Sequence, residues 1–552
     1  MLSKSDFILA SSCPKKLVYK KAGYPTANDT NEYMQMLAKG GYIVGLYAQL
    51  MFPDGMEVQG GSPEKTAAET KKLLEENQNI ILFEASFMSG DKIVRTDILE
   101  KKGDEVHIIE VKSVSHDSEN DTSKQKKKLE DYIRDLAYQA MVVKEAHPMY
   151  HIRSSLFIPD KSKTTAIEGL AGWFHIKEDN KSGDEVEELP ARLRSKFSKP
   201  EVIFVYQEDQ QREAKLAALR EDCLLSLKPC DQEILKIIDD IRKDSEIYLD
   251  ILRSGISPEH YSINKSCRDC EFRTETGVEP NGFRECWGEL ADPKPHIFDL
   301  FHGGSIGHYT KGFYLDELIQ QRRVSFADID PIRFSKADGQ LGSRGERQLL
   351  QFQNTLSGIE FINENLKREL DSLAYPLHFI DFETYLSALP HHKGMRPYEK
   401  ITFQWSCHSI SKPGDDPVHR EYLNDTYAFP NFTFAESLRD TIGDSGTPFM
   451  WSAFENTTLR EVLNQMEVFG YNNSALKDWL IRITSEKKPF RSGRFVDMND
   501  LCLKYYFHPD MKGNIKITHH FSPLHLTFCN FIKFFFNRCS KRIVHYIGKV
   551  LV

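Results

Sequence analysis

The sequence has no run of about eighteen consecutive apolar residues, and its opening residues, 1 to 7, lack the apolar core of a secretory signal peptide. It also lacks a positive charge balance, since the formal net charge is −9 over 552 residues. A uniformly basic nucleic-acid-binding surface is thereby excluded, and any phosphate-binding surface has to be local. Internal repeats and low-complexity segments are missing too. We therefore expect a cytoplasmic protein of roughly two to four folded domains, with no membrane association.

Cysteine is sparse, with ten residues in the whole chain. In a reducing compartment such cysteines are metal ligands, buried small residues or reactive thiols rather than a disulfide framework. Cys267 and Cys270 are separated by two residues, a spacing common to zinc and iron–sulfur sites. A structural Zn²⁺ would need four ligands, and His260 with Cys267, Cys270 and Cys286 can supply them.

Two neighbouring segments carry side chains suited to phosphodiester chemistry. Residues 94–99 and 106–112 are rich in β-branched residues and flank a turn-forming Lys-Gly-Asp, which predicts two antiparallel strands. Because side chains alternate along a strand, Glu110 and Lys112 share one face, and Asp97 can meet them from the neighbouring strand. Two carboxylates can hold Mg²⁺ or Mn²⁺ against a phosphate while an ammonium orients the attacking water. The alternative is that all three line the wet side of an ordinary hairpin.

The flanking pattern extends this centre. A strand is expected at 80–84 before the pair, and a helix from about 129 to 146 follows it and carries Gln139. The order helix, three strands, helix resembles the core of the PD-(D/E)XK nuclease superfamily, in its RecB-like branch. The resemblance implies that Asp97 and Glu110 bind the metal ion. It also implies that the catalytic residues are Asp97, Glu110, Lys112 and Gln139, and Glu84 is a weaker addition to this set. Many members carry a His on the early helix, whereas the stretch 41–47 has none.

The same resemblance bears on the cysteines. Iron–sulfur members of the RecB-like branch, including CRISPR-associated ones, bind a [4Fe–4S] cluster with one N-terminal and three C-terminal cysteines. The matching positions here are Cys13, Cys267, Cys270 and Cys286. The wide span from Cys13 and the long gap between Cys270 and Cys286 depart from the compact CRISPR-type pattern. The resemblance therefore implies an iron–sulfur cluster, and a structural Zn²⁺ is the alternative.

The second half carries a separate acidic motif. A buried strand at 376–384 places Asp381 and Glu383 on one face, because a single residue separates them. This motif resembles the first motif of DEDD-type exonucleases, which have an RNase H-like fold and use two Mg²⁺ ions. Glu455, in the strand and helix start at 448–455, is a third candidate ligand of this second metal site.

The end of the chain departs from that family. Residues 519–552 contain five Lys or Arg and no acid, so the segment that carries the last carboxylate in relatives has none here. We therefore expect the second site to be inactive and the second domain to be truncated. This tail is either a basic amphipathic helix for a membrane or partner, or the product of a shifted reading frame.

The sequence thus predicts an α/β protein in which a PD-(D/E)XK core with a helical insert precedes an RNase H-like domain. The expected parts are a nuclease domain at 1–295, a connecting helical region at 296–370, the RNase H-like domain at 371–518, and the atypical tail at 519–552. As a whole the chain resembles a bacterial family of uncharacterised proteins that fuse these two domains. The resemblance implies nucleic-acid processing, in repair or defence, but it does not fix the substrate. With the residues of the first site, we expect an Mg²⁺- or Mn²⁺-dependent nuclease that acts at ends or single strands, on DNA more than on RNA.

Two other functions stay open from the sequence. The first is a nucleic-acid-binding scaffold whose two nuclease folds have lost catalysis. The second is a 3′–5′ exonuclease on RNA or DNA that acts through Asp381 and Glu383.

Overall fold

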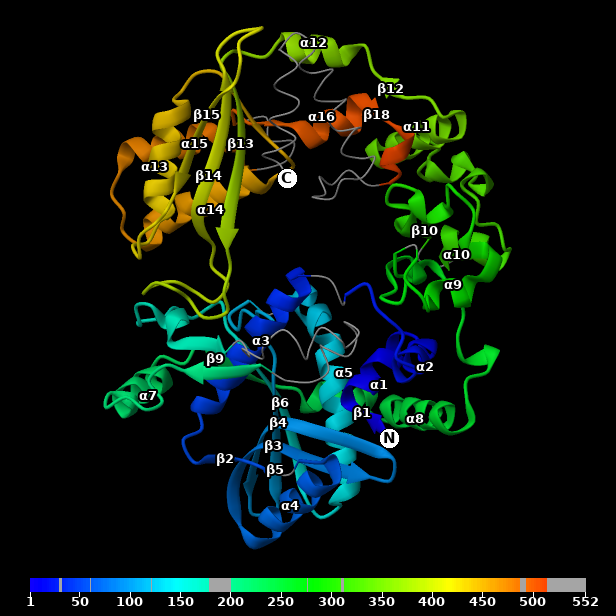
Figure 1. Cartoon of the computed structure of the whole chain (residues 1–552), viewed down its shortest axis with the longest axis vertical. Coiled ribbons are helices and arrows are strands. Elements are labelled where there is room, and N and C mark those ends of the chain that lie inside the picture. The colour runs from blue at the N-terminus through cyan, green and yellow to red at the C-terminus, as the bar shows by residue number, and fades with distance from the viewer. Residues whose placement is uncertain are drawn as a thin grey trace, which may run out of the picture. The chain divides into compact units, whose positions relative to one another are not determined.

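The computed structural model describes residues 1–28, 32–59, 61–120, 122–177, 200–275, 277–308, 312–486 and 493–513. These residues form two compact units, which we describe separately (Figure 1). Unit 1 consists of Met1–Ser262, Cys270–Glu285 and Ser387–Glu399, and unit 2 of Ile263–Asp269, Cys286–Leu386 and the described residues from Lys400. Both combine helices with mixed sheets, which confirms the α/β class. The tail predicted at 519–552 lies outside the described residues, and the domain boundaries stay a prediction.

Unit 1 is built on a seven-stranded sheet. Its order is β2-β3-β4-β5-β6-β9, and β1 adds to β4. The strands are β1 (Leu2–Ser3), β2 (Gly55–Glu57), β3 (Asn79–Ser89), β4 (Lys92–Lys102), β5 (Glu105–Val111), β6 (His151–Pro159) and β9 (Leu225–Pro229). Strands β3, β4 and β5 form the antiparallel meander expected from the sequence. Strands β5 and β6 are parallel and are connected through helix α5 (Ser123–Ala146), as a parallel pair requires a crossover.

Helix α5 begins earlier than the sequence suggested. Thr122 is its N-cap and accepts a hydrogen bond from the Gln125 backbone N–H, so residues 123–128 are helical rather than part of a polar loop. The lysines of this first stretch favour helix and face solvent, so they need no apolar partner. Helix α1 (Lys4–Ser12) has Ser3 as its N-cap.

Helices cover both faces of the sheet in unit 1. On one face α1, α4 (Pro63–Glu76), α5 and α8 (Asp231–Ser254) enclose a core that includes Val106, Ile108 and Leu136. Figure 1 shows α5 running beside the central strands. On the other face α3 (Glu32–Leu50) and α7 (Arg212–Glu221) pack against Ile98 and Ile109. The functional strands β4 and β5 are therefore held between two apolar layers, each stabilised by burial worth about 25 cal/mol per Å².

Three smaller parts complete unit 1. Helix α2 (Pro14–Lys21) follows α1, and β7 (Phe174–Lys177) pairs with β8 (Glu201–Phe204). The third part is the segment Ser387–Glu399, whose Met395 carbonyl accepts from the Thr165 N–H at 2.9 Å. Leu389 of this segment is buried in the α3 side of the core.

Unit 2 is built on a five-stranded sheet with the order β15-β14-β13-β16-β17. Strands β13 (Leu377–Tyr385), β14 (Ile401–Ile410) and β15 (Val418–Leu423) are antiparallel neighbours, whereas β16 (Thr447–Met450) and β17 (Val496–Asp497) run parallel to β13. Helices α13 (Asn431–Ile442), α14 (Phe454–Val468) and α15 (Ser474–Ile483) cover one face, around Trp405 and Trp479. Helices α12 (Asn365–Asp371) and α16 (Met498–Tyr505) pack on the other face with Phe449.

Short elements precede this sheet in the chain. The first is α9 (Gly282–Trp287), most of which belongs to unit 1. The others are β10 (Gly307–His308), β11 (Gly312–Phe313), α10 (Tyr314–Gln320), α11 (Ser343–Ser357) and β12 (Phe361–Ile362), which pairs with β18 (Tyr506–Phe507). Helix α11 ends at Gly358, whose φ of +69° is a left-handed conformation that glycine adopts at low cost. None of the described helices combines the length and apolar character needed to cross a membrane.

Candidate active site

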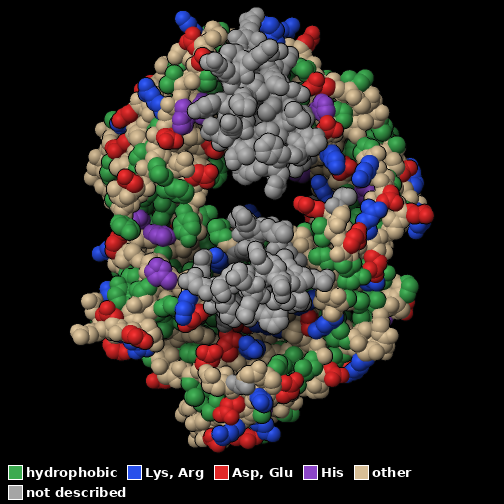
Figure 2. All heavy atoms as spheres, in the orientation of Figure 1, with side chains coloured by type: hydrophobic (Ala, Val, Ile, Leu, Met, Phe, Trp, Pro, Cys, Tyr) green, Lys and Arg blue, Asp and Glu red, His purple; other side chains and the backbone are tan. Residues whose placement is uncertain are grey.

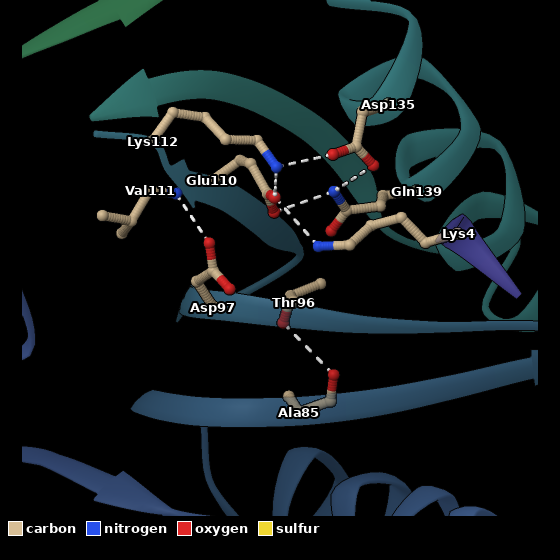
Figure 3. A network of polar contacts seen from close by, with 9 residues as sticks. All are labelled: Lys4, Ala85, Thr96, Asp97, Glu110, Val111, Lys112, Asp135 and Gln139. Carbon is tan, nitrogen blue, oxygen red and sulfur yellow. Dashed lines mark hydrogen bonds and ion pairs between the residues drawn. The ribbon is translucent and has the colours of Figure 1, made fainter. Parts of the chain in front are cut away.

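The acids predicted on β4 and β5 lie where the ladder between these strands ends. Ile98 pairs with Ile109, which makes Asp97 and Glu110 the next positions on the two strands. Beyond this pair the Val111 N–H donates a hydrogen bond to the Asp97 Oδ2 atom at 2.8 Å (Figure 3). This side-chain contact takes the place of a backbone hydrogen bond between the two strands. The side-chain hydrogen bond to the partner strand fixes the position of the Asp97 carboxylate.

The backbone opposite Asp97 is irregular. On β3, Phe83 pairs with Ile98 and Ala85 pairs with Thr96, while Glu84 between them has a φ of +55°. A left-handed conformation is uncommon for a residue with a side chain, and such strain clusters at functional sites. The Glu84 carboxylate lies 3.5 Å from the Arg95 guanidinium. Glu84 therefore has an ion-pair partner on β4.

Glu110 is the centre of the polar network in Figure 3. Its side chain is 1% exposed, and its Oε1 atom accepts from Lys112 Nζ at 2.6 Å and from Lys4 Nζ at 2.9 Å. Its Oε2 atom accepts from Gln139 Nε2 at 2.8 Å. The structure thus brings Glu110, Lys112 and Gln139 together as the sequence predicted. Both carboxylate oxygens of Glu110 are engaged by donors.

Helix α5 contributes a second acid that sequence reasoning missed. Asp135 lies one turn before Gln139, accepts from Lys112 Nζ at 2.7 Å, and accepts from Gln139 Nε2 at 3.4 Å. The spacing of four residues puts both on one helix face, so it could have identified Asp135. Lys112 also lies 5.7 Å above the ring of Tyr132, one turn earlier on the same face.

Lys4 is the other residue that the sequence did not single out. It is the first residue of α1, and 106 positions separate it from Glu110 in the chain. No local sequence pattern identifies this lysine as part of the site. Lys4 comes close to Glu110 only because β1, which precedes it, pairs with β4.

Burial and the neighbouring charges shift the pKa values of the acids and lysines in the site. Burial raises the pKa of Asp97 well above its usual range, and the negative charge of Glu110 adds to this. Burial alone would also raise the pKa of Glu110, but Lys4 and Lys112 outweigh it and lower this pKa. Burial opposes the charged form of Lys112 as well, yet Glu110 and Asp135 raise its pKa above the ordinary value. The lysines are therefore ammonium groups at neutral pH.

The donor set fits a hard divalent cation. Asp97, Glu110 and Asp135 offer carboxylate oxygens, and the Gln139 Oε1 atom is buried with no hydrogen-bond partner among the described residues. Oxygen ligands of this kind suit Mg²⁺ or Mn²⁺. Within the described ranges, no three His, Cys, Asp or Glu residues form a ready metal-ligand group. In this site the ammonium groups of Lys4 and Lys112 lie against the carboxylates.

The predicted cluster cysteines are half-buried, and they divide between the two units. Cys13 is the N-cap of α2 and Cys270 also belongs to unit 1, whereas Cys267 and Cys286 belong to unit 2. In unit 1, α2 is joined to the segment that begins at Cys270, because Lys16 lies 2.6 Å from Glu271. Just beyond α2, the Ala27 N–H donates to the Glu271 carbonyl at 2.7 Å.

The geometry of His260 disfavours the alternative zinc site. Its Nδ1 atom accepts from the Ser257 backbone N–H at 3.2 Å. An accepting Nδ1 places the proton of a neutral imidazole on Nε2, which then has no lone pair for a metal. His260 is therefore a poor fourth ligand for a zinc ion, and the four-cysteine cluster stays a prediction.

A second acidic group lies in unit 2. Glu455, in the first turn of α14, is 3% exposed, and its Oε2 atom has no hydrogen-bond partner among the described residues. Burial, followed by the negative charges of Asp381 and Asp497, raises the pKa of Glu455 to about 8. The charges of Asp381 and Asp497 thus act on Glu455, although within the described ranges no three such side chains form a ready metal-ligand group. Glu383, the other predicted acid of β13, is exposed.

Asp497 enters this group from the end of β17. Its Oδ1 atom accepts from the Ser452 N–H at 2.9 Å and caps α16, and burial raises its pKa. Ser452 has a φ of +66°, so a strained residue lies beside this acidic group as well. The sequence places Asp497 only before a helix, and the sheet order β13-β16-β17 is what brings it near Asp381.

Charge on the visible surface is mixed. On the face shown in Figure 2, Lys and Arg side chains are interspersed with Asp and Glu. This pattern agrees with the net charge of −9 and with a local rather than general phosphate-binding surface.

One family model matches the chain. Residues 378–516 are similar to a domain of unknown function, DUF2779. The match covers about a quarter of the chain and contains the second acidic group. No curated protein and no solved structure shows significant similarity to the chain.

Proposed function

We propose that this chain is a metal-dependent nuclease that hydrolyses phosphodiester bonds of DNA, at ends or in single strands, through the site on β4, β5 and α5. The observation that carries the proposal is the buried Glu110 carboxylate, which Lys112 and Gln139 hold beside Asp97. Solvent-exposed charges on an ordinary hairpin would not be buried or bonded in this way.

The topology of unit 1 supports the same function. The antiparallel β3-β4-β5 meander is followed by helix α5, and this is the order of elements on which the resemblance to a PD-(D/E)XK core rests. Fold alone does not assign activity, so the proposal rests on the acids and lysine at the end of the β4–β5 ladder.

In the proposed reaction Asp97 and Glu110 would hold Mg²⁺ or Mn²⁺, which supplies Lewis acidity toward the scissile phosphate. Gln139 orients Glu110 through its Nε2 donor. The Lys112 ammonium orients the attacking water and stabilises the negative charge that develops on the phosphate. Asp135 in turn holds Lys112 from the helix side and keeps it charged.

We also propose that Cys13, Cys267, Cys270 and Cys286 bind a [4Fe–4S] cluster. The contacts of α2 with the segment after Cys270 support this assignment, because they keep two distant parts of unit 1 together. The hydrogen bond of His260 speaks against the zinc site in which His260 would be the fourth ligand.

The second acidic group favours a second function, in which unit 2 binds a divalent cation together with nucleic acid. The sheet order of unit 2, with two strands parallel to β13, supports an RNase H-like fold. The buried Glu455 oxygen, which has no hydrogen-bond partner among the described residues and feels the charges of Asp381 and Asp497, supports the cation. Exonuclease action by this unit, and a wholly non-catalytic scaffold, are the alternatives.

A digestion assay tests these proposals. Labelled single- and double-stranded DNA and RNA are incubated with the full chain in Mg²⁺ or Mn²⁺, with chelator and with the Asp97→Ala variant as controls. We expect metal-dependent cleavage of DNA that chelation and Asp97→Ala abolish. Binding without cleavage in any metal would favour the scaffold, and cleavage that survives Asp97→Ala would favour unit 2.

A further inference from the structure

Lys4 holds a position that the proposed reaction does not explain. Its Nζ atom lies 2.9 Å from Glu110 Oε1, the same oxygen that accepts from Lys112 at 2.6 Å. Two ammonium groups therefore share one buried carboxylate oxygen. A divalent cation that binds Glu110 through this oxygen would have to displace these ammonium groups or bind close to their positive charges.

The backbone around Lys4 is firmly anchored. Leu2 pairs with Lys92 of β4, and its carbonyl accepts from the Tyr138 hydroxyl at 2.8 Å. The Ser3 side chain and Asp6 form a capping box at the start of α1. Tyr138 directly precedes Gln139 on α5. The same helix therefore anchors the backbone next to Lys4, through Tyr138, and orients Glu110, through Gln139. The position of Lys4 is preorganised rather than incidental.

The formal charges of the site suggest what this lysine does. When every group is ionised, as cation binding to these carboxylates requires, Asp97, Glu110 and Asp135 contribute three negative charges and Lys4 and Lys112 two positive ones, which leaves one negative charge. A divalent cation alone would make the site net positive in a buried environment, which is costly. A cation that arrives with the single negative charge of a phosphodiester leaves the site neutral.

We propose that Lys4 is a positioning residue that makes divalent-cation binding depend on the nucleic-acid phosphate: it competes with the cation for Glu110 in the free enzyme. The inference rests on the proposed function and adds to it an order of loading. Because linkage is reciprocal, the nucleic acid raises the affinity for the cation by the same factor as the cation raises the affinity for nucleic acid.

The test measures Mn²⁺ binding to the full chain by calorimetry, without and with a single-stranded oligonucleotide whose phosphorothioate linkages resist cleavage. Lys4→Gln keeps a neutral hydrogen-bond donor near Glu110 but removes the charge. Without oligonucleotide we expect Lys4→Gln to bind Mn²⁺ at least about tenfold more tightly than the wild type, and addition of oligonucleotide to change its affinity little. The wild type and Lys4→Arg should both gain affinity on addition of oligonucleotide.

Lys92→Met is the matched control. Lys92 is also buried, with Glu145 at 2.9 Å and Glu246 at 3.0 Å, but it lies at the start of β4 away from Glu110. This variant should bind Mn²⁺ like the wild type. Circular dichroism melting identifies any variant that fails to fold, and Lys4→Met provides a second neutral side chain.

The outcomes separate the two proposals. If Mn²⁺ binds in an Asp97-dependent way and a folded Lys4→Gln variant binds Mn²⁺ as tightly as the wild type or more weakly, Lys4 has only a structural role and the inference fails. If no Asp97-dependent Mn²⁺ binding occurs in any variant, the proposed function fails with it.

Discussion

The ammonium group of Lys112 lies 2.6 Å from the Glu110 carboxylate and 2.7 Å from that of Asp135, so one lysine joins a strand acid to a helix acid. Glu110 and Lys112 are two residues apart and share a strand face, which the alternation of side chains predicts. Asp135 approaches from α5, because this helix crosses over between β5 and β6. The lysine is thus held in place before any substrate binds.

Replacing Lys112 by Ala should slow DNA cleavage by roughly 10²–10⁴-fold, because a positioned charge near the reacting phosphate is lost. Single-turnover rates on labelled DNA in Mg²⁺ measure the effect. Lys102→Ala, on an exposed lysine of β4, is the control and should cleave at the wild-type rate. A Lys112→Ala protein that is as fast as the wild type would exclude Lys112 from the reaction.

Asp97→Ala should abolish DNA cleavage by the full chain, whereas Asp381→Ala should leave it nearly unchanged. The reason is that Asp97 belongs to the site with the positioned lysine, while we expect unit 2 to bind a cation without hydrolysis. Digestion of DNA and RNA by both variants is compared at equal protein concentration. Loss of RNA or DNA degradation in Asp381→Ala would instead show that unit 2 is an active exonuclease.

The acidic group of unit 2 should bind one divalent cation independently of unit 1. In the Asp97→Ala protein we expect one remaining Mn²⁺ site by calorimetry, and Glu455→Gln in that background should remove it. The physical reason is that the buried Glu455 oxygen has no hydrogen-bond partner among the described residues, and a cation would supply one. Unchanged Mn²⁺ stoichiometry in the double variant would refute this site.

Protein purified without oxygen should be brown and contain iron and acid-labile sulfide in cluster proportions. Cys267→Ala should lose the colour and lower the melting temperature, because ligand-bound metal contributes to the free energy of folding. Cys407→Ala, on a buried cysteine of β14, should keep the colour. Stoichiometric zinc without iron would overturn the cluster assignment.

Unit 2 should lose stability as the pH falls from about 6.5 toward 4. Burial, together with the charge of Arg494, lowers the pKa of His378 to about 4, below its unfolded value of 6.5. A lowered folded-state pKa means that the stability is fully present above 6.5 and declines by about 1.4 kcal/mol per pH unit down to the folded pKa. Urea unfolding followed by tryptophan fluorescence at pH 7.5 and 5 measures this. His378→Asn should lessen the dependence without abolishing it, because burial and His419 also lower the pKa of His408 to about 4.

Local patterns in the sequence determined most elements around the first site. Segments rich in β-branched residues around a turn predicted β4 and β5 with Asp97 and Glu110, and Lys112 follows directly after β5. These features depend on backbone geometry and on neighbours a few residues away, so a single sequence shows them. The role of Lys112 followed from strand geometry and phosphodiester chemistry, whereas Gln139 and the four-cysteine cluster came from family resemblance; all of these roles stay predictions.

Only the tertiary structure decided which distant residues join these elements. Lys4 reaches Glu110 because β1 adds to β4, and Asp497 reaches Glu455 because β17 lies beside β16. The segment Ser387–Glu399 follows β13 in the chain, yet it packs in unit 1. Such contacts depend on sheet order and helix packing across many residues, and no local periodicity in the chain records them.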